Sequence, residues 1–186
     1  IRLNIEQARS LKKLKNFEKI FNVSVLEGVT GSGKTLVYFE RIREIVNKGF
    51  QGLILLPEIA LTDQFKNRFI NFFGSEPAIW HSKISKKNKK IIWRGIVDNK
   101  IKIVIGARSS LFLPFRKLGI IIVDEEHDAS YKQDEGINYN ARDMAITRAS
   151  IENIPVHLVT SIPSIETYNN IISKKYNHTK LNKRFK

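Results

Sequence analysis

The stretch GVTGSGKT, residues 28–35, constrains the fold of this chain more than any other segment. Its spacing is G-x-x-x-x-G-K-[ST], and it directly follows an apolar run at 23–26, which predicts a strand, a phosphate-binding loop and a helix. The glycines let backbone N–H groups converge on phosphate oxygens, while the following helix contributes the positive end of its dipole. Lys34 is expected to reach the outer phosphates and Thr35 to offer its hydroxyl to Mg²⁺. The residues predicted to bind the nucleotide are Gly28, Thr30, Gly31, Ser32, Gly33, Lys34 and Thr35.

The rest of the chain alternates between strand and helix patterns and has no internal repeat. Strands are predicted at 23–26, 52–56, 78–80, 101–105, 118–123 and 156–161. Helices are predicted at 5–21, 35–47, 59–73, 86–98, 141–152 and 164–173. Apolar strands such as LGIIIVD need cover on both faces, as a parallel sheet between helices provides. The predicted fold is therefore α/β, with three layers and a mainly parallel sheet, in one domain over 1–186 with a ragged, basic tail from about Lys174.

A second motif completes the predicted nucleotide site. The apolar run 120–123 leads directly into Asp124, Glu125, Glu126 and His127. Open α/β sheets bind ligands at the carboxyl ends of their strands, so we expect these acids at the tip of a strand that neighbours the phosphate-binding one. Asp124 is predicted to hold Mg²⁺ together with Thr35, and Glu125 to polarise the attacking water in phosphoryl transfer.

Composition limits the possible partners and compartments. The chain has 32 Lys and Arg against 18 Asp and Glu, a formal charge of +14, which favours a polyanionic partner such as nucleic acid. A compositional bias toward Lys, Ile and Asn is the alternative explanation. The absence of cysteine excludes disulfides and thiolate metal sites within these 186 residues. No apolar run reaches the length of a membrane span, which predicts a cytoplasmic protein without a membrane partner.

The sequence DEEH resembles the D-E-x-H box of the second helicase superfamily, whose members are nucleic-acid motors. Other segments narrow the resemblance to the PriA family of primosomal, replication-restart helicases. These segments are LNIEQ (3–7), LLPEIALTDQ (55–64), WHS (80–82), IGARSSLFLPF (105–115), VDEEHDASYKQ (123–133), YNARDMA (139–145) and PSIET (163–167). The resemblance implies the first RecA-like motor lobe. The family's N-terminal DNA-binding region, zinc module and second lobe with its arginine finger are expected to lie outside these 186 residues.

The resemblance also assigns roles to single residues. It implies that Gln7 recognises adenine and that Pro57, Glu58 and Thr62 contact DNA after the second strand, although proline at a helix start also fits plain capping. Arg108, Ser109 and Ser110 follow the 101–105 strand and are expected to grip DNA phosphates, with an ordinary turn as the alternative.

The segment DASYKQDEGINYNARD resembles the family's aromatic-rich loop, which couples DNA binding to ATP hydrolysis. It places Tyr131, Lys132, Tyr139 and Arg142 beside the acids. We expect the tyrosines to stack on unpaired bases and the cations to meet the backbone. The alternative is that both tyrosines plug the surface of the lobe.

Three further expectations concern neighbouring residues. Phe112 and Phe115 are predicted to pack in the core or against another lobe. His127 is expected to relay hydrogen bonds between the catalytic site and the loop that follows. Where the family has Ser-Ala-Thr before Pro-Ser, this chain has Thr160, Ser161 and Ile162, so Thr160 or Ser161 is expected to supply the missing hydroxyl.

These observations favour an ATP-driven DNA helicase lobe that uses ATP and Mg²⁺ and binds single-stranded or forked DNA. Primosome and single-strand-binding proteins are partners that the resemblance implies. Two alternatives stay open. The isolated chain could be a nucleotide- and DNA-binding module without turnover, because full catalysis uses an arginine from another lobe. A small-molecule transferase with the same loop would need an arginine lid and an acceptor pocket.

Overall fold

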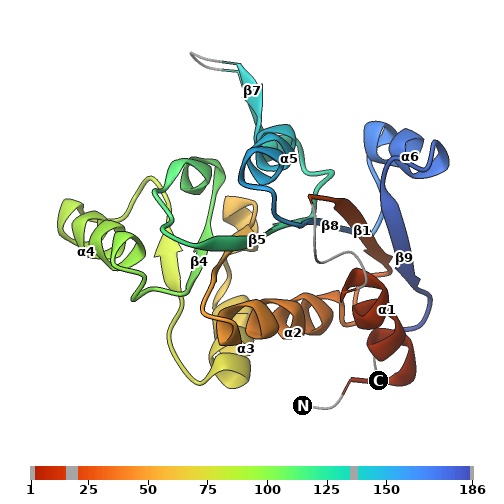
Figure 1. Ribbon diagram of the computed structural model, residues 1–186, viewed down its shortest axis with the longest axis horizontal. Coiled ribbons are helices and arrows are strands. Elements are labelled where there is room, and N and C mark those ends of the chain that lie inside the picture. Colours follow the sequence, from red (N-terminus) through yellow and green to blue (C-terminus); the bar gives the residue numbers. More distant parts are fainter. Residues whose placement is uncertain (1–2, 16–20, 135–137, 185–186) are drawn as a thin grey trace.

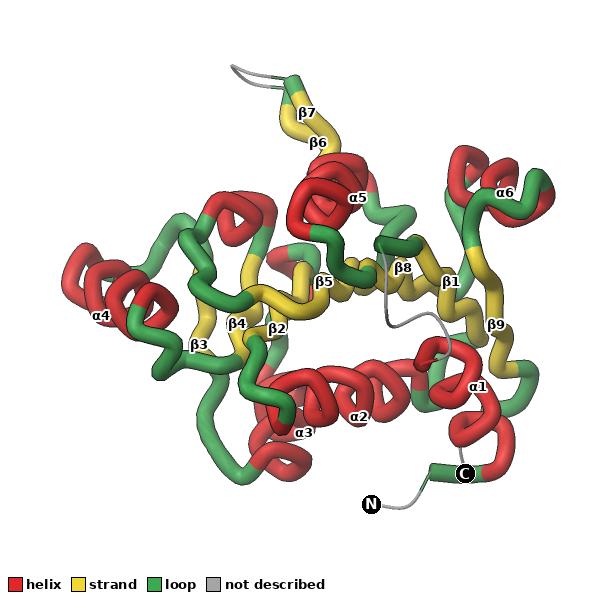
Figure 2. Tube along the Cα trace, in the orientation of Figure 1, coloured by secondary structure: helices red, strands yellow, loops and turns green. Residues whose placement is uncertain are grey.

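A parallel sheet of seven strands forms the middle layer of the chain (Figures 1 and 2). The computed structural model describes residues 3–15, 21–134 and 138–184. The strand order is β3-β4-β2-β5-β8-β1-β9, and each neighbouring pair is parallel. The strands are β1 (Val23–Gly28), β2 (Gln51–Leu55), β3 (Ala78–Trp80), β4 (Ile103–Gly106), β5 (Leu118–Asp124), β8 (Val156–Thr160) and β9 (Asn177–Leu181). All carboxyl ends of these strands therefore lie along one edge of the sheet.

Helices form the outer layers (Figure 1). One face of the sheet is covered by α1, α2 and α3 and the other by α5, while α4 lies near the β3 edge and α6 leads into β9. Their bounds are α1 (Ile5–Lys15), α2 (Lys34–Asn47), α3 (Asp63–Phe73), α4 (Lys86–Val97), α5 (Ala141–Glu152) and α6 (Ile165–Ile172). Short 3₁₀ turns follow three strands: η1 (Glu58–Ala60), η2 (Arg108–Phe112) and η3 (Ala129–Tyr131).

The core consists of two apolar clusters, one on each face of the sheet. On one face, Val37 and Ile42 of α2 pack with the sheet and with Leu14 of α1. On the other face, α5 contributes small side chains at four-residue spacing, Ala141, Ala145 and Ala149, which let the helix approach the strands closely. Within the described ranges, no helix is both long and apolar enough to cross a membrane.

The predicted fold class is confirmed, and the strand and helix positions agree with the expectation except at particular points. The helix expected at 59–73 is split into η1 and α3, because the side chain of Thr62 accepts a hydrogen bond from the Phe65 N–H (3.2 Å) and starts a new helix. The helix expected at 5–21 is described as far as Lys15, and residues 16–20 lie outside the described ranges.

The ragged tail expected from Lys174 is wrong for 177–181, which form the edge strand β9 beside β1. Along β9 the side chains alternate: Thr179 and Leu181 are buried, whereas Lys180 is exposed. Lys180 Nζ lies 2.6 Å from the Glu27 carboxylate of β1. Sequence analysis missed this strand because buried and exposed residues alternate over only five positions, in a segment of basic composition.

A small antiparallel pair was also not predicted. Strands β6 (Lys132–Gln133) and β7 (Tyr139–Asn140) form it within the loop that follows the acids, and it projects from the body beyond α5 (Figures 1 and 2).

We predict that Leu181→Ala lowers the free energy of unfolding by roughly 2 to 5 kcal/mol, because it empties a buried site between β9 and the α1–α2 side of the core. Lys180→Ala on the same strand is the matched control and should cost less than about 1 kcal/mol. Urea denaturation measures both. Equal effects of the two variants would show that β9 is not an integral strand.

Candidate functional site

The loop between β1 and α2 has the shape of a phosphate cradle. Gly31 and Gly33 have φ values of 80° and 82°, a left-handed conformation that glycine adopts without strain. Lys34 Nζ donates to the Gly28 carbonyl at 2.6 Å and so bends back over the loop. The Ser32 hydroxyl oxygen is buried and has no hydrogen-bond partner among the described residues. The loop thus offers a cation and an unused hydroxyl to an incoming anion.

The acids lie at the tip of β5 and face this loop. Asp124 is the last residue of β5, and its carboxylate accepts hydrogen bonds from the Tyr38 hydroxyl (2.8 Å) and the Glu125 N–H (3.0 Å). The expectation that β5 neighbours β1 is wrong, because β8 lies between them. Since all three strands are parallel, the two tips still share one edge, about 10 Å apart by strand spacing.

Tyr38 joins the two predicted magnesium ligands, and sequence analysis missed it. It lies on α2, one turn after Lys34, so its hydroxyl reaches Asp124 and lies near the Thr35 hydroxyl. Burial raises the pKa of Tyr38, so the phenol stays protonated and donates to Asp124. The signal that could have found it is the four-residue spacing from Lys34, which puts both side chains on one helix face.

Asp124 is an unusually basic carboxylate. Burial is the main reason that its pKa is raised to about 6, and the charge of Glu125 raises the pKa further. The hydrogen bond from Tyr38 and the charge of Lys34 lower the pKa in part. A divalent cation at Thr35 and Asp124 would favour the ionised form. The buried carboxylate, the nearby hydroxyl and the cradle together fit Mg²⁺ with a triphosphate.

His127 connects the acids to the tip of β8. Its Nδ1 lies 2.7 Å from the Thr160 hydroxyl, and its Nε2 lies 3.6 Å from the Glu125 carboxylate. Thr160 also donates to the Ile162 carbonyl at 2.7 Å. His127 thus contacts Glu125 and Thr160, whereas its expected relay to the following loop, and the substitute hydroxyl expected of Thr160 or Ser161, stay predictions.

Glu126, which sequence analysis left without a role, is the buried centre of a polar network. Its carboxylate accepts hydrogen bonds from the Ser164 N–H (2.7 Å), the Ser164 hydroxyl (3.0 Å), the Thr167 hydroxyl (2.9 Å) and the Arg142 guanidinium (3.3 Å). It thereby fastens α5 and α6 to the tip of β5. The signal was the Ser-x-x-Thr spacing at the start of α6.

This network corrects the prediction for Arg142. The side chain is largely buried and is held by Glu126, Asp143 and Ser164, with Glu166 at 3.7 Å. Hydrogen bonds and charge from Asp143 and Glu126 outweigh burial and raise the pKa of Arg142. The expected contact of Arg142 with a DNA backbone is wrong, because its guanidinium is used inside the lobe.

Tyr131 is also corrected. It is 1% exposed, and its hydroxyl donates to the backbone carbonyls of Leu55 (3.1 Å) and Asp124. The ring has no free face for a base, so base stacking is wrong for Tyr131, and the alternative of a plug holds for it. These hydrogen bonds join β2 to β5 next to the acids.

Gln7 lies against the phosphate-binding loop. Its amide nitrogen donates to the Ser32 carbonyl at 3.2 Å, and its amide oxygen accepts from the Asn4 N–H at 2.9 Å. The side chain is completely buried in this arrangement. The adenine contact stays a prediction that requires the amide to become exposed.

Several predicted DNA-binding residues line one cleft at the carboxyl ends of β2, β4 and β5. The cleft has a volume of about 190 Å³ and is lined by Leu56, Pro57, Glu58, Ala107, Arg108, Ser130 and Tyr131. The Arg108 guanidinium donates to the Lys132 carbonyl, which joins η2 to β6. The structure thus brings Pro57, Glu58, Arg108 and Lys132 to one side of the sheet edge.

The other predicted DNA-binding side chains differ in their exposure to solvent. Thr62 and Ser109 are exposed, and Thr62 caps α3. Ser110 is buried and donates to the Ala107 carbonyl, so the phosphate grip expected of it is wrong and the turn alternative holds. Tyr139 is half-buried on β7.

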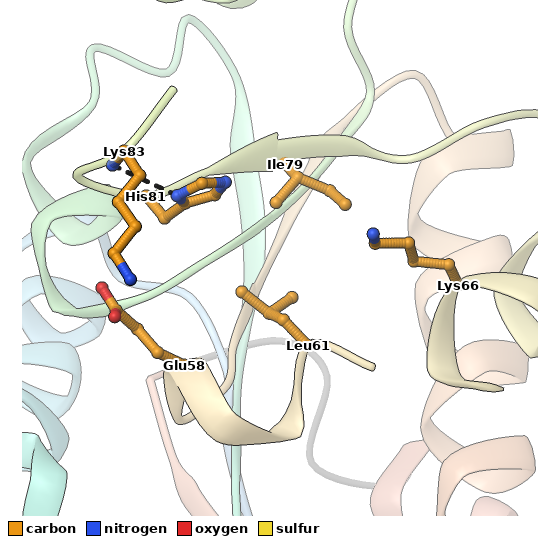
Figure 3. Close-up of a pocket in the computed structure, with 6 residues that line it drawn as sticks. All are labelled: Glu58, Leu61, Lys66, Ile79, His81 and Lys83. Carbon is orange, nitrogen blue, oxygen red and sulfur yellow. Dashed lines mark hydrogen bonds between the residues drawn. The ribbon is translucent and has the colours of Figure 1, made fainter. Parts of the chain in front are cut away.

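A second cleft, about 250 Å³ in volume, continues from Glu58 toward the tip of β3 (Figure 3). Lys66, His81 and Lys83 line it, and Figure 3 shows the ends of Lys83 and Glu58 facing one another. His81 Nδ1 accepts the Lys83 N–H at 3.2 Å, which leaves its proton on Nε2 when the ring is neutral. Basic groups therefore extend along the same edge beyond the first cleft.

Comparisons with known proteins identify the family of this chain. Residues 1–182 match the family described as "Type III restriction enzyme, res subunit". The chain belongs to this family. Family relatives named "Replication restart protein PriA" include those of Rickettsia conorii, 55% identical over 88% of this chain, and Haemophilus influenzae, 45% identical over 98%. The chain spans 25% of the length of each, and the resemblance to the PriA family is confirmed.

Solved structures outside these close relatives share the fold. The Pyrococcus furiosus Hef helicase domain has a TM-score of 0.68 at 18% identity, over 96% of this chain and 38% of that one. The helicase MrfA, solved with DNA and AMPPNP, has a TM-score of 0.65 at 20% identity, over 98% of this chain and 27% of that one. The family fold is thus that of RecA-like helicase domains.

We predict that Asp124→Asn changes how stability depends on pH when no metal is added. The folded-state pKa of Asp124 is raised from 3.8 to about 6, so its stabilising effect is complete below pH 3.8 and is lost as the pH rises through 6. Wild type should lose about 2 kcal/mol relative to the variant between pH 4 and pH 7. Urea denaturation across that range measures the difference, with the exposed Asp98→Asn as control. Parallel profiles for wild type and Asp124→Asn would contradict the raised pKa.

Proposed function

We propose that this chain is the ATP-binding motor lobe of a PriA-type DNA helicase that couples ATP hydrolysis to movement along single-stranded or forked DNA in replication restart. The observation that carries the proposal is the convergence of the phosphate cradle and the Asp124 carboxylate on one sheet edge, bridged by Tyr38. The relatives named as replication restart proteins support the class of motor.

The residues of the chain fit the steps of nucleotide binding. Lys34 would exchange the Gly28 carbonyl for phosphate oxygens, and the loop N–H groups would hold the remaining charge. Mg²⁺, when bound, would neutralise charge on the phosphates. Thr35 and Asp124 would hold it, and Tyr38 would keep their oxygens in place.

Glu125 is placed to orient a water molecule for attack. Its φ of 50° turns the chain sharply at the end of β5, and its carboxylate is half-buried beside His127. As a partly exposed base next to the loop, it can accept a proton from water. His127 then links Glu125 to Thr160 at the tip of β8.

DNA would cross the same edge on the side of β2 and β4. The cleft with Glu58 and Arg108 and the exposed Lys132 lie there, and the second cleft adds Lys66 and Lys83. Arg and Lys at such an edge bind phosphates without regard to sequence, as a translocating motor requires. MrfA, which shares the fold, is solved bound to DNA.

The finer assignments follow from the same proposal. We propose a cytoplasmic protein whose other lobe and zinc module belong to a longer polypeptide, with primosome and single-strand-binding proteins as partners. An arginine from a second lobe would complete the transition state, so this lobe alone is expected to bind ATP with little turnover.

Two substitutions test the nucleotide site. Lys34→Ala should weaken binding of a fluorescent ATP analogue by roughly 10- to 100-fold, because a charge-assisted phosphate contact is lost. Glu125→Gln should leave that affinity unchanged and abolish DNA-stimulated ATPase activity in a polypeptide that also carries the second lobe. Lys12→Ala, an exposed cation of α1, is the matched control for charge.

Unchanged nucleotide affinity in Lys34→Ala would contradict the cradle, and normal turnover in Glu125→Gln would remove Glu125 from the mechanism. ATPase activity that ignores added DNA would favour a small-molecule transferase instead.

A further inference from the structure

Arg68 on α3 places a positive charge beside the phosphate-binding loop that sequence analysis did not include in the nucleotide site. Its guanidinium donates a hydrogen bond to the Thr35 hydroxyl at 3.4 Å. Its charge also reaches the Tyr38 phenol: burial raises the pKa of Tyr38, and Arg68 lowers that pKa in part. Arg68 therefore lies next to the hydroxyl that is proposed to hold Mg²⁺.

Aromatic packing fixes the backbone of Arg68 at this position. Phe65 and Phe69 of α3 are buried and meet the Phe39 ring of α2 edge to face, with centroids 5.8 and 5.7 Å apart. Phe39 follows Thr35 by four residues, so both lie on the face of α2 that α3 covers. Residues three apart are neighbours on a helix, which puts Arg68 beside Phe65 at this contact. A rigid pair of helices thus presents the guanidinium to the first turn of α2.

No acid among the described residues pairs with this guanidinium. The side chain of Arg68 is exposed, and its hydrogen bond to Thr35 is to a neutral group. Arg43 on α2 differs, because its guanidinium pairs with the Glu40 carboxylate. The charge of Arg68 is therefore available to an anion that enters the loop.

Lys34 is in a comparable situation, since its ammonium group donates to the neutral Gly28 carbonyl at 2.6 Å. A triphosphate in the loop would bring several negative charges close to the carboxylates of Asp124 and Glu125. Lys34 and one Mg²⁺ would leave part of that charge unbalanced. A second cation at the first turn of α2 would reduce the remaining repulsion.

We infer that Arg68 is a further phosphate-binding residue of the nucleotide site. When nucleotide binds, its guanidinium leaves the Thr35 hydroxyl, which becomes available to Mg²⁺, and donates to an oxygen of the β- or γ-phosphate. The rigid helix α3 then touches both ligands, DNA at Thr62 and nucleotide at Arg68, about 9 Å apart along its axis. The inference rests on the proposed function, since it requires the chain to bind a nucleoside triphosphate.

The test measures the affinity of the chain for a fluorescent, non-hydrolysable ATP analogue in the presence of Mg²⁺. Arg68→Ala should weaken binding roughly 5- to 30-fold, because a charge-assisted hydrogen bond to phosphate is lost. Its affinity should also fall less steeply with added salt than that of wild type, because one exposed charge contact is missing. Arg68→Lys should recover most of the affinity, since a single phosphate contact needs a positive charge rather than a planar fork.

Arg43→Ala is the matched control. Arg43 is a partly exposed arginine of α2 whose guanidinium lies 5.3 Å from the centroid of the Phe72 ring of α3, so it also joins these two helices. This variant should bind the analogue as wild type does. Thermal unfolding of each variant measures what the two arginines contribute to the packing of α2 against α3.

Equal affinity of wild type and Arg68→Ala would overturn the phosphate contact and leave the proposed nucleotide site standing, provided that Lys34→Ala binds more weakly. Equal losses in Arg68→Ala and Arg43→Ala would also overturn it, and would show that Arg68 only joins α3 to α2. An unchanged salt dependence in Arg68→Ala would have the same meaning. If wild type bound no analogue, this inference and the proposed function would both be contradicted.

Discussion

The hydrogen bond from Tyr38 to Asp124 is the interaction on which the rest of the site depends. It joins the helix that starts at the phosphate-binding loop to the strand that carries the acids, across the intervening strand β8. Because the Thr35 hydroxyl lies near the same phenol, the oxygens proposed to hold magnesium are gathered around one side chain. Burial of this cluster raises the pKa of Asp124 and keeps the site responsive to a cation.

From that centre, two sets of contacts lead outward. His127 and Thr160 carry the position of Glu125 to the tip of β8, and Glu126 binds the first turns of α5 and α6. In the ion pair of Glu126 and Arg142, the carboxylate of Glu126 is fully buried and accepts several hydrogen bonds. A buried ion pair is tolerated when its polar atoms are satisfied in this way. These contacts join the catalytic edge to β8, α5 and α6, whereas Tyr131 joins Asp124 to Leu55 of β2, on the side proposed for DNA.

The sequence predicted the three-layer fold and the nucleotide cradle well because both depend on local spacing. The loop at 28–35 and the apolar strand before Asp124 each carry their signal within a few residues. Tyr131, Arg142 and Ser110 were assigned to the surface because their types suit DNA, and the structure buries them.

These errors share a physical cause. A polar side chain faces either solvent or a carbonyl from another strand, depending on how segments distant in the sequence pack on the sheet. Sequence patterns are local and do not contain that information. The same holds for β9, which becomes a strand because β1 offers it a free edge. Gln7 is an intermediate case, since it was expected to bind the nucleotide and its contact with the Ser32 carbonyl was not predicted.

A crystal structure of this chain with magnesium and a non-hydrolysable ATP analogue tests the central claim most directly. The account predicts the triphosphate on the backbone amides of 30–35, with Lys34 moved from the Gly28 carbonyl to the phosphates and the metal between Thr35 and Asp124. A nucleotide bound away from the tips of β1 and β5, or a metal that does not approach Asp124, would contradict it.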